Sequence, residues 1–176
     1  MKKIFSLGIV LTLVIALLAA CGNNNEPAAS EPAASEPDAV TSASIVNTEE
    51  AFLNAISKDG TWIIATLGDM KIDQELVLEG EFTNKDAVAR KIALYTQDEE
   101  RNITASFKLT APKLTVKSEN ARIQGGTFVG DVYVEANGFK LVKATVEGNV
   151  YFASEEIKAT YDASDEGVVT GVVEVK

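Results

Sequence analysis

A short hydrophobic pattern recurs at a fixed spacing in the second half of this 176-residue chain, and it constrains the fold more than any other feature. Residues 114–116 (LTV), 132–134 (VYV) and 150–152 (VYF) begin eighteen residues apart, and two hydrophobic residues flank one outward residue each time. A unit of this length cannot bury its own apolar face, so that neighbouring units must stack on one another. The spacing therefore predicts a series of stacked strands.

The same shift relates other pairs of positions outside the three triplets. These pairs are Ile123 and Leu141, Phe128 and Val146, and Gly130 and Gly148. After five extra residues, assigned to a loop at 162–167, the pattern resumes at Gly171. We therefore predict a mainly β domain over residues 45–176, built as a short right-handed parallel β-helix, that is, a solenoid.

A helix is expected before the first strands. Asn47 can cap its first turn, with Glu50 three residues later completing a capping box, and Asp59 and Gly60 then end it. We expect this helix to cover the N-terminal end of the solenoid. Beyond Gly60, short apolar runs separated by Gly, Asp, Asn and Pro predict strands.

One signal favours a different fold, an antiparallel β meander or sandwich. Asn137 and Gly138 stand between two apolar runs, and both residues tolerate the positive φ that a type I′ hairpin turn requires. The eighteen-residue shift holds at several separate positions and resumes after an insertion, which a single hairpin does not predict. We therefore favour the solenoid.

The first residues have the layout of an export signal. Lys2 and Lys3 precede a largely apolar run, which ends in Leu-Ala-Ala and then Cys21, the single cysteine of the chain. This stretch resembles the lipobox of bacterial lipoproteins. The resemblance implies a signal peptide at 1–20, lipidation of Cys21 with acyl chains such as palmitate, and a protein held by that lipid at the extracytoplasmic face of the cell membrane.

Residues 21–44 are expected to form a lipidated tether. The pentapeptide EPAAS occurs twice in succession and is followed by another Glu-Pro, a composition that has little apolar surface to bury. The chain carries 16 basic and 26 acidic side chains, a formal net charge of −10. Such a charge disfavours binding to nucleic acid or to anionic headgroups, so the lipid is expected to provide the attachment.

Two stretches of the domain resemble known β-helical families. Residues 47–78, with a helix, DGTWII and then IDQELVL, look like the N-terminal cap and first coil of pectate-lyase-type β-helices. Residues 144–150 (ATVEGNV) are similar to the repeats of bactofilin-like, polymer-forming proteins. Both resemblances imply a parallel β-helix. Bactofilins are cytoplasmic scaffolds without a lipobox, so their filament function is not carried over.

The sequence offers few residues for catalysis. It contains no histidine, which removes the usual general base and metal ligand. The acidic candidates are Asp98, Glu99, Glu100, Glu155, Glu156, Asp162, Asp165 and Glu166, all in polar stretches that are typical of solvated loops. Asp162, Asp165 and Glu166 offer the hard oxygen ligands that suit calcium, but their spacing matches no EF-hand loop, which favours an ordinary acidic loop. We assign no catalytic residue, no metal site and no cofactor.

Tyr133 and Tyr151 are the best binding candidates. They occupy the same outward position on adjacent units, so we expect them side by side about 4.8 Å apart. Such a pair is a candidate surface for a glycan or protein partner, while cross-strand stabilisation is the other interpretation. The sequence thus predicts a non-catalytic binding or assembly module, with self-assembly through an open end as one form. The alternative is a small β-helix carbohydrate-active enzyme of the polysaccharide lyase or glycosidase kind.

Overall fold

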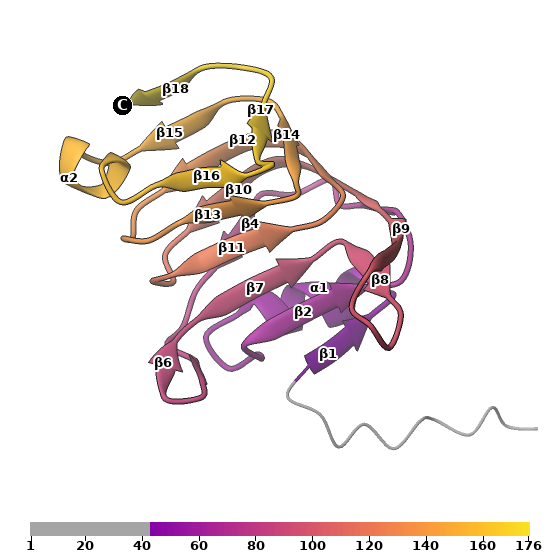
Figure 1. Cartoon of the computed structure of the whole chain (residues 1–176). Helices are drawn as coiled ribbons and strands as arrows, with labels where there is room; N and C mark the ends of the chain where they lie inside the picture. Colours follow the sequence, from indigo (N-terminus) through magenta and orange to yellow (C-terminus); the bar gives the residue numbers. More distant parts are fainter. Residues whose placement is uncertain (1–42) are drawn as a thin grey trace, which may run out of the picture. The chain divides into compact units, whose positions relative to one another are not determined.

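The computed structural model describes residues 43–176 (Figure 1). The predicted signal peptide and Cys21 lie outside the described residues, as does the predicted tether except for its last two positions. Those two positions belong to the first strand, which begins at Ala43 rather than at the predicted domain start, Ile45.

Two parallel sheets contain most of the strands. Sheet 1 has the order β1 (Ala43–Val46), β2 (Ile63–Thr66), β7 (Arg90–Ala93), β11 (Ala121–Gln124), β13 (Lys140–Val142) and β16 (Asp162–Asp165). Sheet 2 contains β3 (Met70–Lys71), β4 (Leu76–Leu78), β10 (Lys108–Val116), β12 (Thr127–Val134), β14 (Thr145–Glu147), β15 (Val150–Phe152), β17 (Val168–Val169) and β18 (Val173–Val175). The sheets lie one in front of the other in Figure 1.

The remaining elements are short. Two antiparallel hairpins pair β5 (Thr83–Asn84) with β6 (Ala87–Val88) and β8 (Tyr95–Gln97) with β9 (Ile103–Ser106). The helices are α1 (Glu49–Ile56), which contacts β1, β2 and β4, and α2 (Glu155–Lys158), which contacts β15 and β18. The described part of the chain is therefore mainly β, with mostly parallel sheets.

The strand register confirms the predicted correspondences. Val132 lies opposite Leu114 on one side and Val150 on the other, and Val150 in turn lies opposite Val173. The other predicted pairs are also partners across neighbouring strands: Ile123 with Leu141 and Phe128 with Val146. The eighteen-residue shift in sequence is thus one step across the sheet in space.

Between the two sheets, inward side chains form rows of aliphatic contacts. In sheet 2 Leu114, Val132 and Val150 are fully buried, and in sheet 1 the row contains Ile64, Ile92, Ile123 and Leu141, none more than 1% exposed. Phe128 and Phe139 are among the largest buried side chains. Each such side chain contributes about 1.5–3 kcal/mol by leaving water, so the rows hold the sheets together.

Glycines allow the strands of sheet 2 to stack closely at one bend. Gly130 has a φ of 138°, and a methyl group there would overlap the carbonyl oxygen of Ala111. A methyl group at Gly148 would overlap the carbonyl oxygen of Gly130 in the same way. Next to them, the backbone N–H and the side-chain amide of Asn149 both donate to Asp131 at 2.9 Å. The two glycines therefore allow neighbouring segments of the chain to approach closely at this bend, and the hydrogen bonds from Asn149 to Asp131 link the two segments.

The antiparallel alternative is wrong for these two sheets. Asn137 and Gly138 do form a turn, with Gly138 at a φ of 77°. The strands on either side of that turn do not pair with each other, because β12 belongs to sheet 2 and β13 to sheet 1. The predicted type I′ geometry is also wrong, because Gly138 has a positive φ and Asn137 does not. This turn moves the chain from one sheet to the other.

Two local predictions also need correction. Helix α1 is capped by Thr48, whose side chain accepts a hydrogen bond from the N–H of Ala51 at 3.2 Å, instead of by Asn47 and Glu50. Both residue types cap helices, and the cap at Thr48 belongs to the helix that buries Phe52 and Ile56. The predicted loop at 162–167 begins with strand β16, which joins the edge of sheet 1 with an irregular register.

Candidate functional site

Tyr133 and Tyr151 lie side by side on the outer face of sheet 2. They are direct partners on β12 and β15, and their ring centroids are 4.9 Å apart with the planes tilted by 45°. The row continues across the sheet with Thr115 on one side and Glu174 on the other. The predicted juxtaposition is therefore present in the fold.

The tyrosine pair is largely covered. Tyr151 is only 8% exposed, and the Nζ atom of Lys176 lies 3.9 Å from the centroid of its ring. The neighbouring Tyr151 raises the pKa of Lys176 above its ordinary value, so this cation stays charged at neutral pH. Tyr133 is half-buried, with Lys113 Nζ 5.5 Å from its ring centroid. This arrangement fits cross-strand packing, while the binding role of the pair stays a prediction.

Three of the acidic candidates act as hydrogen-bond acceptors. The Ser164 hydroxyl and backbone N–H, together with Lys140, hold the pKa of Asp162 well below its ordinary value. The side chain of Asn102 lowers the pKa of Asp98, and the Ser154 hydroxyl lowers that of Glu156. A general acid at neutral pH requires the opposite shift, because it must hold its proton. Asp98 and Asp162 accept hydrogen bonds from nearby backbone N–H groups, and Glu156 lies in the first turn of α2. These three carboxylates therefore have local structural roles.

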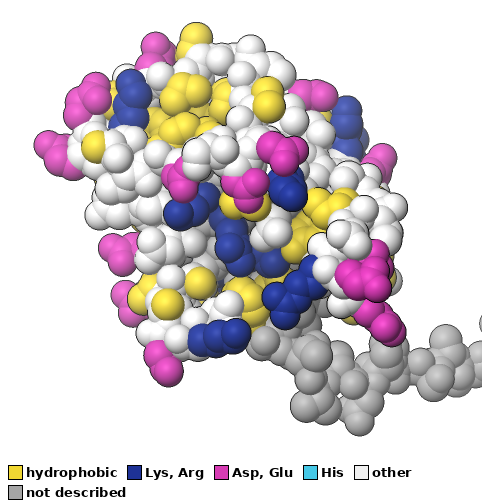
Figure 2. Space-filling view, in the orientation of Figure 1, with side chains coloured by type: hydrophobic (Ala, Val, Ile, Leu, Met, Phe, Trp, Pro, Cys, Tyr) yellow, Lys and Arg dark blue, Asp and Glu magenta, His cyan; other side chains and the backbone are white. Residues whose placement is uncertain are grey.

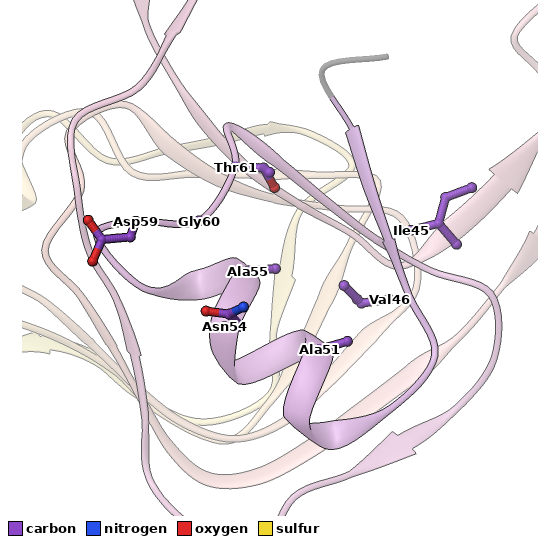
Figure 3. Close-up of a pocket in the computed structure, with 8 residues that line it drawn as sticks. All are labelled: Ile45, Val46, Ala51, Asn54, Ala55, Asp59, Gly60 and Thr61. Carbon is purple, nitrogen blue, oxygen red and sulfur yellow. The ribbon is translucent and has the colours of Figure 1, made fainter. Parts of the chain in front are cut away.

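A pocket of about 270 Å³ lies between β1 and α1 (Figure 3). Small side chains such as Ala51 and Ala55 line it. Asp59, its charged residue, forms an ion pair with Lys58 at 3.1 Å. The lining mixes apolar and polar side chains and contains a single charged one.

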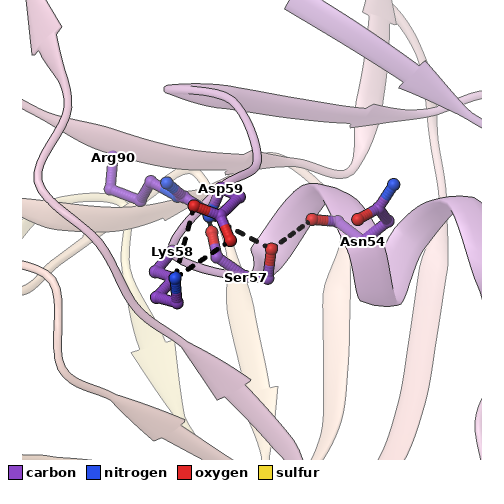
Figure 4. A network of polar contacts seen from close by, with 5 residues as sticks. All are labelled: Asn54, Ser57, Lys58, Asp59 and Arg90. Carbon is purple, nitrogen blue, oxygen red and sulfur yellow. Dashed lines mark hydrogen bonds and ion pairs between the residues drawn. The ribbon is translucent and has the colours of Figure 1, made fainter.

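Arg90 secures the C-terminal end of α1 (Figure 4). Its Nη2 group donates to the carbonyl oxygens of Ala55 at 2.8 Å and Ser57 at 2.9 Å, and the Phe82 ring covers the guanidinium at 3.8 Å. Only 1% of the side chain is exposed, and burial lowers its pKa to about 10. A cation at a helix C-terminus stabilises the unpaired carbonyls, so Arg90 has a structural role.

Basic side chains form a row on the outer face of sheet 1. Lys91 on β7 is the register partner of Arg122 on β11, which is the partner of Lys140 on β13. We call these three residues the basic row. Figure 2 shows Lys and Arg side chains gathered near the middle of this face. The row is unexpected in a chain whose formal net charge is −10.

A polar pocket of about 360 Å³ adjoins the basic row. It is lined by residues of the β8–β9 hairpin and of the ends of sheet 1, namely Tyr95, Gln97, Arg101, Asn102, Ile103, Gln124, Val142, Lys143 and Asp165. We call it the hairpin pocket. The Nζ atom of Lys91 connects it to the row, donating to the Tyr95 hydroxyl at 3.0 Å and to the Gln124 side-chain oxygen at 3.3 Å.

The basic row was missed in the sequence, although part of it was accessible there. Ile123 and Leu141 correspond under the eighteen-residue shift, so their neighbours Arg122 and Lys140 do too. Lys91 lies outside that spacing, and only the pairing of β7 with β11 brings it into the row. The hairpin pocket also depends on where the β8–β9 hairpin folds, which the repeat does not encode.

No protein-family model, curated protein or solved structure matches this chain. Within residues 43–176, no helix is long and apolar enough to cross a membrane, and no three Asp, Glu, His or Cys residues are grouped as metal ligands.

Proposed function

We propose that this chain is an extracytoplasmic lipoprotein, anchored in the membrane through lipid on Cys21, whose non-catalytic β-solenoid serves as a binding or assembly module. The anchor rests on the sequence alone, where an apolar run ends in Leu-Ala-Ala-Cys. Two or more acyl chains provide stable attachment, which a single short chain does not.

The solenoid is supported by the strand register. Each step across sheet 2 from β10 to β12, β15 and β18 takes the chain once through sheet 1 as well, by way of β11, β13 and β16. A chain that alternates between two parallel sheets in this way winds in coils, with the rows of buried side chains at the centre. We propose that these coils form a short right-handed parallel β-helix.

A binding role is carried by one observation, the basic row on the outer face of sheet 1. Stacked coils place equivalent outward side chains about 4.8 Å apart, which builds a repetitive surface that suits an extended or multiply charged partner. The lowered pKa values of Asp98, Glu156 and Asp162 disfavour these three carboxyl groups as the general acid that a glycosidase requires.

Replacement of the cysteine tests the anchor. In cells that express the full chain, the N-terminal peptide that begins at Cys21 is expected to carry acyl chains in mass spectra, and Cys21→Ala is expected to abolish this peptide. Gly22→Ala, which keeps the thiol, is the matched control and should retain the acylated peptide. A Cys21 peptide without acyl chains in the unchanged protein would contradict the proposal.

A further inference from the structure

Two cations of the basic row have no acidic partner in the described part of the chain. Among residues 43–176, no carboxylate lies within ion-pair distance of Lys91 or Arg122, whereas Lys140 pairs with Asp162 at 3.0 Å. Lys91 is only 8% exposed, and its hydrogen-bond partners are the neutral Tyr95 and Gln124 side chains. A buried ammonium group is costly without a counter-charge, so an anion beside it would be stabilised.

Cations outnumber carboxylates around this site. The basic row and the hairpin pocket contain five cations, Lys91, Arg101, Arg122, Lys140 and Lys143. The carboxylates are Asp162, Asp165 and Asp98, the last of which accepts a hydrogen bond from the pocket residue Asn102 at 3.0 Å. The formal sum of these eight groups is +2. One carboxylate on a ligand would neutralise a single charge, whereas a phosphate monoester carries about −1.5 to −2 at neutral pH. The excess therefore favours phosphate.

The basic row and the hairpin pocket together provide the groups that such a ligand needs. Arg122 offers a planar set of donors that matches phosphate geometry, and Lys91 offers a compact positive charge. The Tyr95 hydroxyl accepts from Lys91, which leaves its own proton free to donate. Gln97 lines the pocket and presents an amide that can bind a hydroxyl group of the molecule that carries the phosphate.

We propose that the basic row and the hairpin pocket bind a phosphate-bearing ligand, with its phosphate group between Lys91 and Arg122 and the rest of the molecule in the hairpin pocket. This inference rests on the proposed binding module and names the ligand of that module. The phosphate can come from a soluble sugar phosphate or from the glycerophosphate of a lipid headgroup, which share this chemistry.

Thermal unfolding of the purified full-length chain in a non-ionic detergent tests the proposal. The midpoint is measured against rising concentrations of glucose 6-phosphate, glycerol 3-phosphate and inorganic phosphate, at an ionic strength held constant with sodium chloride. A ligand that binds only the folded state raises the midpoint. We expect glucose 6-phosphate or glycerol 3-phosphate to raise it, and the stronger of the two identifies the source of the phosphate.

Matched variants locate the effect on the structure. Arg122→Gln is expected to weaken the apparent affinity about tenfold, since it removes a charge-assisted hydrogen bond. Lys113→Gln is the control, because it removes a cation that pairs with Glu75 at 2.6 Å on sheet 2, and it should leave the affinity unchanged. Asp162→Asn frees Lys140 and should tighten binding about threefold, whereas Asp73→Asn, beside Lys71, should not.

Several results would overturn the proposal. They are a midpoint that no phosphate compound raises, an equal response of Arg122→Gln and the unchanged chain, and an equal response to glucuronate and glucose 6-phosphate. These results leave the Cys21→Ala experiment untouched, because that experiment measures acylation of the N-terminal peptide and needs no ligand. Loss of the phosphate site and loss of the anchor are therefore distinguishable.

Discussion

The outer faces of the two sheets differ in how their charges are balanced. On sheet 2, Lys113 pairs with Glu75 at 2.6 Å, Lys108 pairs with Glu147 at 3.4 Å, and Lys176 lies over the Tyr151 ring. On sheet 1, Lys91 and Arg122 have no carboxylate partner among the described residues. The two faces share one stacked architecture, so the difference comes from the outward side chains alone.

This comparison separates two tasks that stacked strands can perform. The outward residues of sheet 2 stabilise the fold through contacts between neighbouring strands, since the rings of Tyr133 and Tyr151 pack on each other. The outward row on sheet 1 places like charges in register, which costs stability and prepares a site for an anion. We therefore propose a structural role for the outer face of sheet 2 and a binding role for the outer face of sheet 1.

The largest expected effect comes from breaking the stacking on which both faces depend. Gly148→Ala forces a methyl group against the Gly130 carbonyl, and we expect a loss of about 3 kcal/mol in the free energy of unfolding. Gly68→Ala is the control, because nothing lies within 4 Å of the added methyl group, and it should change stability by about 0.5 kcal/mol or less. Urea denaturation of both variants measures the difference, and equal losses would count against close stacking at Gly148.

Alanine at the tyrosine pair tests whether the sheet 2 face is structural. Tyr151→Ala should cost about 2 kcal/mol, because this side chain is only 8% exposed. Tyr133→Ala should cost about 1 kcal/mol, because its ring is only half-buried. The same denaturation experiment compares them. Loss of phosphate binding in either variant, with stability unchanged, would reverse the roles of the two faces.

The buried hydroxyl group of Tyr161 provides a test of side-chain packing between the two sheets. This hydroxyl has no hydrogen-bond partner among the described residues, and burial, with a smaller effect of Asp162, raises its pKa to about 12. We expect Tyr161→Phe to stabilise the fold by about 1 kcal/mol at neutral pH, because it removes an unpaired polar group.

The pH dependence of the same variant provides a second measurement. A raised pKa means that the protonated tyrosine is favoured in the folded state, so its contribution is complete below pH 10 and is lost as the pH rises through about 12. Unfolding midpoints between pH 9 and pH 12 should therefore fall more steeply for the unchanged chain than for Tyr161→Phe. Parallel curves would contradict burial of the hydroxyl.

The smallest expected change in the free energy of unfolding comes from removing one charged side chain on each face. At low salt, Arg122→Gln should raise the free energy of unfolding by about 0.5 kcal/mol, because it relieves repulsion within the basic row. Lys113→Gln should lower it by a similar amount, because it removes the ion pair with Glu75. Unfolding in 10 mM and in 500 mM salt measures both, and the two changes should shrink in high salt. Changes of the same sign would show that the faces do not differ.

The sequence was sufficient for those parts of the fold that depend on periodicity. The eighteen-residue shift predicts which residues of β10, β12 and β15 are partners, since stacking requires the same buried position at every step. It does not predict that residues 108–116, which read as separate apolar runs, form one strand, β10. Nor does it distinguish Thr48 from Asn47 as a helix cap, because both residue types can accept the bond.

The candidate site was only partly accessible from the sequence. Tyr133 and Tyr151 were found because they stand at the same place in the repeat, but the position of Lys176 over Tyr151 depends on how the last strand folds. Arg122 and Lys140 obey the repeat as well, whereas Lys91 joins them only through long-range pairing of β7. The strand register is therefore needed to show that Lys91, Arg122 and Lys140 lie beside one another.

Nuclear magnetic resonance of the full-length chain in detergent tests the central claim, that sheet 1 carries the binding face, most directly. Amide shifts are followed while glucose 6-phosphate is added at constant ionic strength. We predict that the changes concentrate at Lys91, Arg122 and Gln124, and that Tyr133 and Tyr151 stay unchanged. Changes centred on the tyrosine pair, or none at the basic row, would contradict the claim.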